Sequence, residues 1–161
     1  MAGAVTVSCH ARVSPERVWA CLADPYSFAE WVAGTSRIRS ADASWPAPGA
    51  ELHHSWGVWP VKVRDHTTVI AADPPRRLLL EARARPAGAV HAEIRVLTEP
   101  GGAHVVLYED LIEGWGARWP RLGRIVQYLR NRRSVRRLAA LAERSQDGAP
   151  RPGLAARARR R

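Results

Sequence analysis

The chain is poor in several kinds of residue, and each shortage argues against a class of protein. Cysteine occurs only as the isolated Cys9 and Cys21, which could form a bridge in principle but which we expect to be reduced. No uninterrupted apolar run approaches the roughly 18 residues of a membrane-spanning helix. The first residues lack the basic and apolar segments of a secretory signal. We therefore expect a cytoplasmic protein without a membrane span.

The sequence motifs of several enzyme classes are also missing. The chain contains no Gly-x-Gly-x-x-Gly unit, Walker loop, Gly-x-Ser-x-Gly elbow or His-Glu-x-x-His motif. Their absence argues against nucleotide binding, serine hydrolysis and zinc proteolysis. Of the six histidines, His53 and His54 are adjacent on an expected strand. Their side chains then point to opposite faces and cannot bind one ion together. We expect no metal and no cofactor.

Lysine is nearly absent, and arginine carries a positive charge that is unevenly distributed. Residues 1–117 contain 11 Lys and Arg against 13 Asp and Glu, a net charge of −2. Residues 118–161 contain 14 arginines against two acids, a net charge of +12, so the formal charge of +10 comes from the last quarter of the chain. This placement argues against a protein that coats nucleic acid, which would be basic throughout.

The apolar pattern predicts one strand followed by two short helices. Val5, Val7 and Cys9 alternate with polar residues, as in a strand with one buried face. Ser14 followed by proline predicts a helix with serine as its N-cap. Asp24 followed by proline predicts a second short helix, which Gly34 would end.

Six further strands and one long helix are expected after this. The strands are separated by Pro, Gly and Asp turns, and such short links favour antiparallel pairing. The expected strands cover residues 37–44, 50–58, 61–71, 77–85, 89–98 and 103–113. The long helix is expected from about Trp119 to Glu143. Its apolar stripe would contain Leu122, Ile125, Val126 and Leu129, continued by Val135, Leu138, Leu141 and Ala142.

This order of elements predicts an α+β fold in which a curved antiparallel sheet of about seven strands wraps around the long helix. The space between such a sheet and one helix is hard to fill, and it becomes a ligand cavity. We expect one folded domain at residues 1–144. Residues 145–161 lose the apolar pattern and gain Pro, Gly and Arg, which predicts a disordered arginine-rich tail.

Several segments resemble the SRPBCC superfamily (START-like, or Bet v1-like), in its polyketide cyclase/dehydrase and lipid transport group. They are Val-Ser-Pro-Glu-Arg-Val-Trp at 13–19, Leu-Ala-Asp-Pro at 22–25, Trp31, Val-Ile-Ala-Ala-Asp-Pro-Pro-Arg-Arg-Leu at 69–78, Gly-Gly-Ala-His-Val at 101–105 and Arg-Arg-Leu-Ala-Ala-Leu-Ala-Glu at 136–143. The resemblance implies a helix-grip fold with a hydrophobic cavity for a lipid, an aromatic or a polyketide-like molecule. It does not imply catalysis, because many members of this fold only bind.

Three polar side chains are candidates for catalysis. Asp65 shares the alternating face of Val63 and Thr67, which would place it inside unless a bulge turns it outward. On two other strands, one of His53 and His54 must face inward, and one of Glu109 and Asp110; His54 and Glu109 are our candidates for the inward positions. A buried carboxylate or imidazole has the character of a general acid or base, as the cofactor-free cyclisation of a polyketide would require.

Aromatic and apolar residues are candidates for ligand contact. Trp19 and Trp31 are expected to be structural, whereas the other candidates would rim or line the cavity. These are His53, Trp56, Trp59, Tyr108, Trp115, Trp119, Leu122 and Val126.

Two further functions compete with a cyclase or dehydratase. One is a carrier that binds a lipid or another ligand without catalysis. The other is a module that docks through the arginines of the long helix to an acidic carrier protein or an anionic surface. Nucleic acid is a less favoured partner, because aromatic residues are not interleaved with these arginines.

Overall fold

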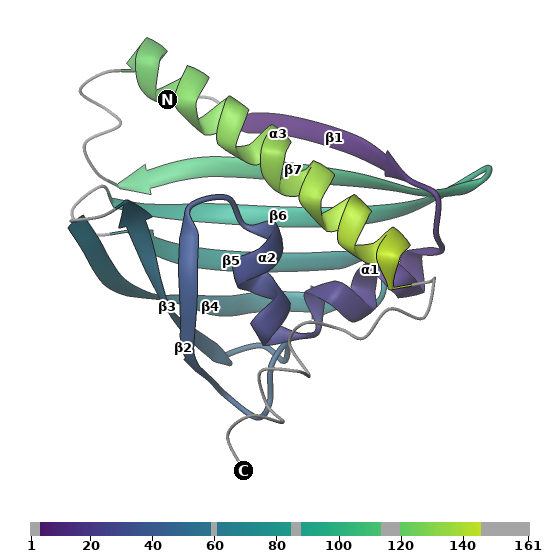
Figure 1. Ribbon diagram of the computed structural model, residues 1–161, viewed down its shortest axis with the longest axis horizontal. Coiled ribbons are helices and arrows are strands. Elements are labelled where there is room, and N and C mark those ends of the chain that lie inside the picture. Colours follow the sequence, from purple (N-terminus) through teal and green to yellow (C-terminus); the bar gives the residue numbers. More distant parts are fainter. Residues whose placement is uncertain (1–3, 59–60, 85–87, 114–119, 146–161) are drawn as a thin grey trace.

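The computed structural model describes residues 4–58, 61–84, 88–113 and 120–145, which form one sheet and a set of helices on one of its faces (Figure 1). The elements in chain order are β1 (Val5–Ala11), α1 (Pro15–Leu22), the 3-10 helix η1 (Pro25–Ser27), α2 (Phe28–Trp31), β2 (Thr35–Ala41), β3 (Glu51–Val58), β4 (Val61–Asp73), β5 (Arg77–Ala84), β6 (Gly88–Glu99), β7 (Gly102–Glu113) and α3 (Pro120–Arg144). The predicted order of elements is confirmed.

The seven strands form one antiparallel sheet in the order β1-β7-β6-β5-β4-β3-β2. Consecutive strands from β2 to β7 are neighbours, as expected for short turns. The first strand pairs with the last, Val5 opposite Glu109 and Ala11 opposite Ala103. The long helix α3 crosses the sheet diagonally beside β1 and β7, and it also packs on α1 and α2 (Figure 1).

The core lies between the inner face of the sheet and the helices. Strands other than β2 contribute buried side chains, which alternate with exposed ones in β1: Val5 and Val7 are buried, while the intervening Thr6 is exposed. Leu22 of α1 and Leu138 of α3 complete the core from the helical side. Burying one such large apolar side chain stabilises the fold by about 1.5–3 kcal/mol, so the alternation determines which face of each strand points inward.

The two predicted helix starts differ in how they are capped. Ser14 occupies the N-cap position of α1, but its side chain makes no capping hydrogen bond, contrary to the expectation. Asp24 does cap, because its carboxylate accepts a hydrogen bond from the backbone N–H of Tyr26 at 3.0 Å. The second helical segment ends earlier than expected, because α2 stops at Trp31 and Val32 is already extended; Gly34, with φ of +98°, lies in the turn that follows.

The expected continuous apolar stripe of α3 is wrong. The C-terminal half of the helix is buried as predicted, with Val135, Leu138 and Ala142 against the core. In contrast, the apolar residues of the N-terminal half are exposed. They are Leu122, Ile125, Val126 and Leu129. Leu129 and Val135 are six residues apart, roughly one and two-thirds turns, so the two stripes lie on different faces of the helix.

The strand β2 lies at one edge of the sheet and pairs irregularly with β3. Its register shifts between Thr35 and Arg37 and again between Ile38 and Ser40. The sheet that grips one long helix, with two short helical segments between its first two strands, makes this a helix-grip fold.

Candidate ligand-binding site

A cavity of about 70 Å³ lies between the inner face of the sheet and the helices α2 and α3. Its walls are mostly apolar, with aromatic rings from α2 on one side and strands β5, β6 and β7 on the other. The lining residues are Phe28, Trp31, Val32, Leu80, Ala82, Val90, Ala92, Ile94, Leu107, Glu109, Arg130, Asn131 and Ser134. Trp31, expected to be structural, is buried in the core and lines the cavity as well.

One end of the cavity is polar, and α3 supplies most of it. The buried carboxylate of Glu109 on β7 forms an ion pair with the guanidinium of Arg130 and accepts a hydrogen bond from Gln127 Nε2 at 3.0 Å. Arg130 also donates to Asn131 Oδ1, from Nε at 3.3 Å and from a terminal nitrogen at 3.2 Å. The Glu109 charge is therefore compensated and held in place by two side chains of one helix.

Ser134 connects α3 to the end of α2 at this polar end. Its hydroxyl donates to the backbone carbonyl of Arg130 at 3.0 Å and accepts from the backbone N–H of Ala33 at 3.0 Å. Ser134 is buried, so both of its contacts are shielded from water. This connection fixes the position of α3 relative to α2 above the cavity.

The amide nitrogen of Asn131 is a buried polar atom of this site without a hydrogen-bond partner among the described residues. The side chain of Asn131 is only 1% exposed. A buried donor without a partner costs about 1–3 kcal/mol. Because Asn131 also lines the cavity, its Nδ2 is the donor of this site with which an acceptor atom of a ligand can pair.

A second polar cluster lies on the inner face of β3 and β4. His54 and Asp65 are directly opposite one another in the register, and both are 5% exposed. His54 Nε2 lies 3.0 Å from the hydroxyl oxygen of Thr67. Burial lowers the pKa of His54 from 6.5 to about 4; the Asp65 carboxylate acts in the opposite direction, and Arg39 lowers the pKa further. His54 is therefore neutral at physiological pH.

Phe28 separates this cluster from the cavity. Its ring centroid lies 5.7 Å from that of His54, and Phe28 itself lines the cavity. His54 Nδ1 has no hydrogen-bond partner among the described residues. Asp65 Oδ1 accepts a hydrogen bond from the backbone N–H of His66 at 3.0 Å, which holds the carboxylate beside its own strand.

The inward orientation predicted for Asp65, His54 and Glu109 is confirmed, because all three are buried. No bulge turns Asp65 outward, since it pairs with His54 in a regular stretch of β3 and β4. The structure brings His54 and Asp65 together but not Glu109, because β5 and β6 lie between β4 and β7. Only Glu109 of the three lines the cavity.

The structure does not place four of the expected ligand contacts at the cavity. His53 and Tyr108 alternate with the buried His54 and Glu109, so they lie on the outer face of the sheet. There His53 pairs with Glu51, and the guanidinium of Arg95 lies 5.1 Å from the centroid of the Tyr108 ring. Leu122 and Val126 are exposed on the outer side of α3, away from the cavity.

The remaining tryptophan candidates cannot be placed at the site. Trp56 belongs to β3, where its backbone is opposite Val63, but its side chain lies outside the described part of the structure. Trp59, Trp115 and Trp119 lie outside the described residues altogether. A role for these four residues in ligand contact stays a prediction.

The helical side of the site was not among the predicted residues; it consists of Gln127, Arg130, Asn131 and Ser134. A signal was present, because Asn131 lies seven residues before the buried Leu138 and Ser134 lies four residues before it. Such spacing places all three on one face of a helix. Extending the buried stripe of the C-terminal half upstream would have found these residues.

Comparison with known proteins agrees with this geometry. A sheet that holds a helix over an apolar cavity with one polar end defines the chain as a helix-grip protein. A family model described as polyketide cyclase / dehydrase and lipid transport matches residues 2–145, and the chain belongs to this family. No curated protein matches the chain in sequence.

Solved structures share the fold at low sequence identity. The protein CV1439 from Chromobacterium violaceum is 20% identical with a TM-score of 0.69, over 87% of this chain and 97% of its own. The protein NE0264 from Nitrosomonas europaea is 16% identical with a TM-score of 0.70, over 89% and 96%. DynU16, a protein of the dynemicin biosynthetic locus, is 16% identical with a TM-score of 0.60, over 88% of this chain and 47% of its own. Similarities this low show the fold alone.

Proposed function

We propose that this protein binds a small hydrophobic molecule, aromatic or polyketide-like, with a carbonyl or hydroxyl oxygen at its buried end. The observation that carries the proposal is the unpaired Nδ2 of Asn131 at the polar end of an otherwise apolar cavity. Apolar walls bind the body of a ligand without direction, and a single fixed donor orients it. Membership of a family described by polyketide chemistry and lipid transport is consistent with such a ligand.

The charges at the polar end favour a neutral ligand. The Glu109 carboxylate and the Arg130 guanidinium compensate each other, so neither offers a free charge to the cavity. A charged group would have to be desolvated against apolar walls without a counter-ion, which is costly. A ketone, an enol or an alcohol fits the donor of Asn131 without this cost.

Two probe molecules of nearly the same shape test the proposal. Acetophenone has a carbonyl oxygen where isopropenylbenzene has a methylene group, and calorimetric titration measures the affinity of the protein for each. We expect acetophenone to bind about threefold to tenfold more tightly, the value of one net hydrogen bond. Equal affinities would contradict the role of Asn131, and failure of both molecules to bind would contradict the cavity itself.

A pair of phenylalanine substitutions tests where the probes bind. Ala92→Phe places a ring into the cavity and should abolish the binding of both molecules. Leu97→Phe, on the same strand but exposed, adds an aromatic ring outside the cavity and should leave both affinities unchanged. Loss of binding in both variants would mean that the added ring, and not its position, causes the effect.

Catalysis of cyclisation or dehydration is the second candidate function, and the neutral His54 beside Asp65 favours it. A neutral imidazole with a free ring nitrogen can remove a proton from an activated carbon. Phe28 would have to move to admit a substrate to this nitrogen. Glu109 is held by Arg130 and is better suited to positioning than to proton transfer.

Ligand extraction and mass spectrometry would identify the substrate for a test of catalysis. Turnover of that compound should then fall by about 100-fold or more in His54→Gln and Asp65→Asn if the pair acts as base and partner. The matched control is His53→Gln on the outer face, which should keep wild-type turnover. Binding without turnover in the wild-type protein would leave the carrier as its function.

A further inference from the structure

The N-terminal half of α3 presents an apolar surface to the outside of the molecule. We call this surface the outer apolar face. It consists of Leu122, Ile125, Val126 and Leu129, which are 58%, 57%, 59% and 57% exposed. Large apolar side chains exposed one by one are ordinary, but four on one helix face mark an interaction surface. None of the four is needed to close the cavity, whose helical wall consists of Arg130, Asn131 and Ser134 together with α2.

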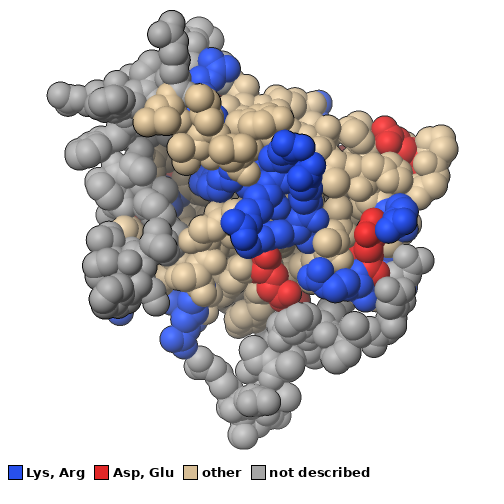
Figure 2. Space-filling model, turned by 45° about the horizontal axis from the view of Figure 1, so that its top comes forward, with Lys and Arg blue, Asp and Glu red and all other residues tan. Residues whose placement is uncertain are grey.

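Arginines continue the same side of the helix in the C-terminal direction. Arg132, Arg133 and Arg136 follow Leu129 by three, four and seven residues, which places them on its face, and all three are exposed. Among the described residues, no carboxylate forms an ion pair with any of them. Figure 2 shows basic side chains gathered near the centre of one face of the molecule, beside a broad uncharged area.

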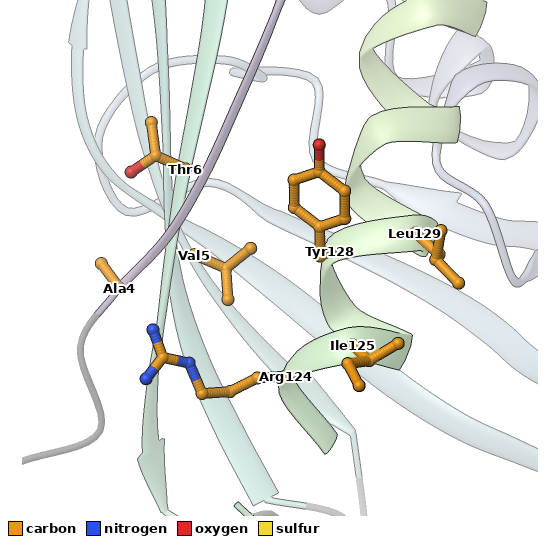
Figure 3. A pocket seen from close by; sticks show the side chains of 7 residues that line it. All are labelled: Ala4, Val5, Thr6, Arg124, Ile125, Tyr128 and Leu129. Carbon is orange, nitrogen blue, oxygen red and sulfur yellow. The ribbon is translucent and has the colours of Figure 1, made fainter. Parts of the chain in front are cut away.

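A groove runs along the flank of this helix half, between α3 and β1. It has a volume of about 340 Å³ and is lined by Ala4, Val5, Thr6, Arg124, Ile125, Tyr128 and Leu129. Figure 3 shows the Arg124 side chain extended from the helix toward β1 and the Tyr128 ring between the two elements. The groove therefore combines apolar walls with a guanidinium at its edge.

We propose that the outer apolar face, together with Arg132, Arg133 and Arg136, docks the protein on an anionic phospholipid membrane. An amphipathic helix in the plane of a membrane buries apolar side chains among the acyl chains and places arginines near the lipid phosphates. The groove beside the helix can take an apolar chain while Arg124 meets the headgroup. From Pro120 to Ala142 the chain contains no acid, so an anionic surface is the complementary partner.

A second copy of the chain fits this surface less well. Its α3 would bring the same uncompensated arginines, and each chain carries a formal charge of +10. Like charges on both partners oppose such an association. Among the described residues, no helix is long and apolar enough to cross a bilayer.

Flotation with two kinds of lipid vesicle tests the proposal. We expect the protein to bind vesicles of phosphatidylcholine mixed with phosphatidylglycerol and to bind phosphatidylcholine alone much more weakly. The triple variant Leu122→Ser, Val126→Ser and Leu129→Ser should weaken binding by more than about tenfold, because it removes the inserting side chains. Replacing Arg132, Arg133 and Arg136 with Gln should lower the affinity for the anionic vesicles by about fivefold for each arginine.

Matched substitutions elsewhere provide the controls. Ile70→Ser with Leu97→Ser removes two exposed apolar residues from the sheet, and Arg37→Gln with Arg64→Gln removes two exposed arginines. Both pairs should keep wild-type binding to the vesicles. If either control pair weakens binding as much as the α3 variants do, the contact is not specific to α3 and the proposal is overturned. If the serine variant of α3 binds like the wild type, charge alone attracts the protein and the proposal is overturned as well.

Two further outcomes would also overturn the proposal. One is absence of binding to the anionic vesicles. The other is a dimer in sedimentation velocity that the serine variant dissociates, which would make the outer apolar face a contact between copies of the chain. Failure of the proposed function would look different: the protein would bind the anionic vesicles but not the ketone probe. The two properties are separable, because Ala92→Phe should lose binding of the ketone probe and keep vesicle binding.

Discussion

Two buried nitrogen atoms differ in what surrounds them, although both lack a hydrogen-bond partner among the described residues. His54 Nδ1 belongs to a ring that packs against Phe28 and contacts Thr67 through its other nitrogen. Asn131 Nδ2 belongs to a side chain that lines the cavity. The first lies behind an aromatic ring and the second lies where a ligand would bind. Each therefore leads to a different prediction.

Asn131→Leu should make the protein a poorer ligand binder with little change in stability. Leucine has a similar size and removes a buried donor without a partner, but it also removes the Oδ1 that accepts from Arg130, so the two effects oppose each other and the free energy of unfolding should change by less than about 1 kcal/mol. The preference for acetophenone over isopropenylbenzene should disappear. Urea unfolding measures the first effect and calorimetry the second. A variant that keeps the preference would show that another group binds the carbonyl oxygen.

The protein should lose stability as the pH falls from about 6.5 to about 4, in part because of His54. The unfolded chain binds a proton on His54 near pH 6.5, whereas the folded protein binds it only near its lowered pKa of about 4. The contribution of the neutral ring is therefore complete above pH 6.5 and lost by pH 4. It amounts to up to about 3 kcal/mol in the free energy of unfolding.

Urea unfolding over this pH range checks the contribution of His54. His54→Gln should show a shallower decline than the wild-type protein, since glutamine does not titrate. His10→Gln provides the control, because that side chain is exposed in the folded protein and should leave the decline as it is. An equally steep decline in His54→Gln would assign the acid sensitivity to other groups.

The two halves of the helix α3 should contribute very differently to stability, because the C-terminal half is buried and the N-terminal half is exposed. Leu138→Ala should destabilise the protein by about 2–5 kcal/mol, because Leu138 is completely buried. Leu129→Ala should change the free energy of unfolding by less than about 0.5 kcal/mol, because Leu129 is exposed. Urea unfolding of the two variants makes the comparison. Similar losses would show that the N-terminal half packs against the rest of the protein.

Most elements could be predicted because their signals are local. Proline and glycine turns mark the ends of the strands, and the expected bounds differ from the observed ones by three residues at most. The stripe of α3 was misjudged because apolar residues occur on both of its faces. Periodicity shows which residues share a face, but only the tertiary contacts decide which face is buried.

Across the whole molecule, the sequence predicted the polar residues that the strands contribute to the candidate site but not those that α3 contributes. Strand alternation placed Asp65 on the inner face and required one residue of each adjacent polar pair to face inward; in the structure these are His54 and Glu109. It could not show that β5 and β6 separate Glu109 from the other two, because their distance depends on the order of the strands in the sheet. The residues around Asn131 were not predicted, because polar side chains on a helix usually face solvent.

Folding places exposed arginines of α3 on one side of the helix. On α3, exposed arginines such as Arg132, Arg133 and Arg136 share one side, while the opposite side of the C-terminal half packs against the core. Arg130 lies elsewhere on the helix and reaches Glu109 at the cavity, and Arg124 extends toward β1. The same helix therefore separates a basic outer surface from a cavity whose charges are compensated.

The irregular pairing of β2 has a consequence for solubility at high concentration. An edge strand exposes backbone N–H and C=O groups that can pair with the edge of another molecule and start a fibril. The two register shifts of β2 interrupt the regular spacing of these groups, and the exposed Arg37 adds a charge on the same strand. A second sheet therefore finds no straight, uncharged strand there to extend, and β2 protects the protein from aggregation at that edge.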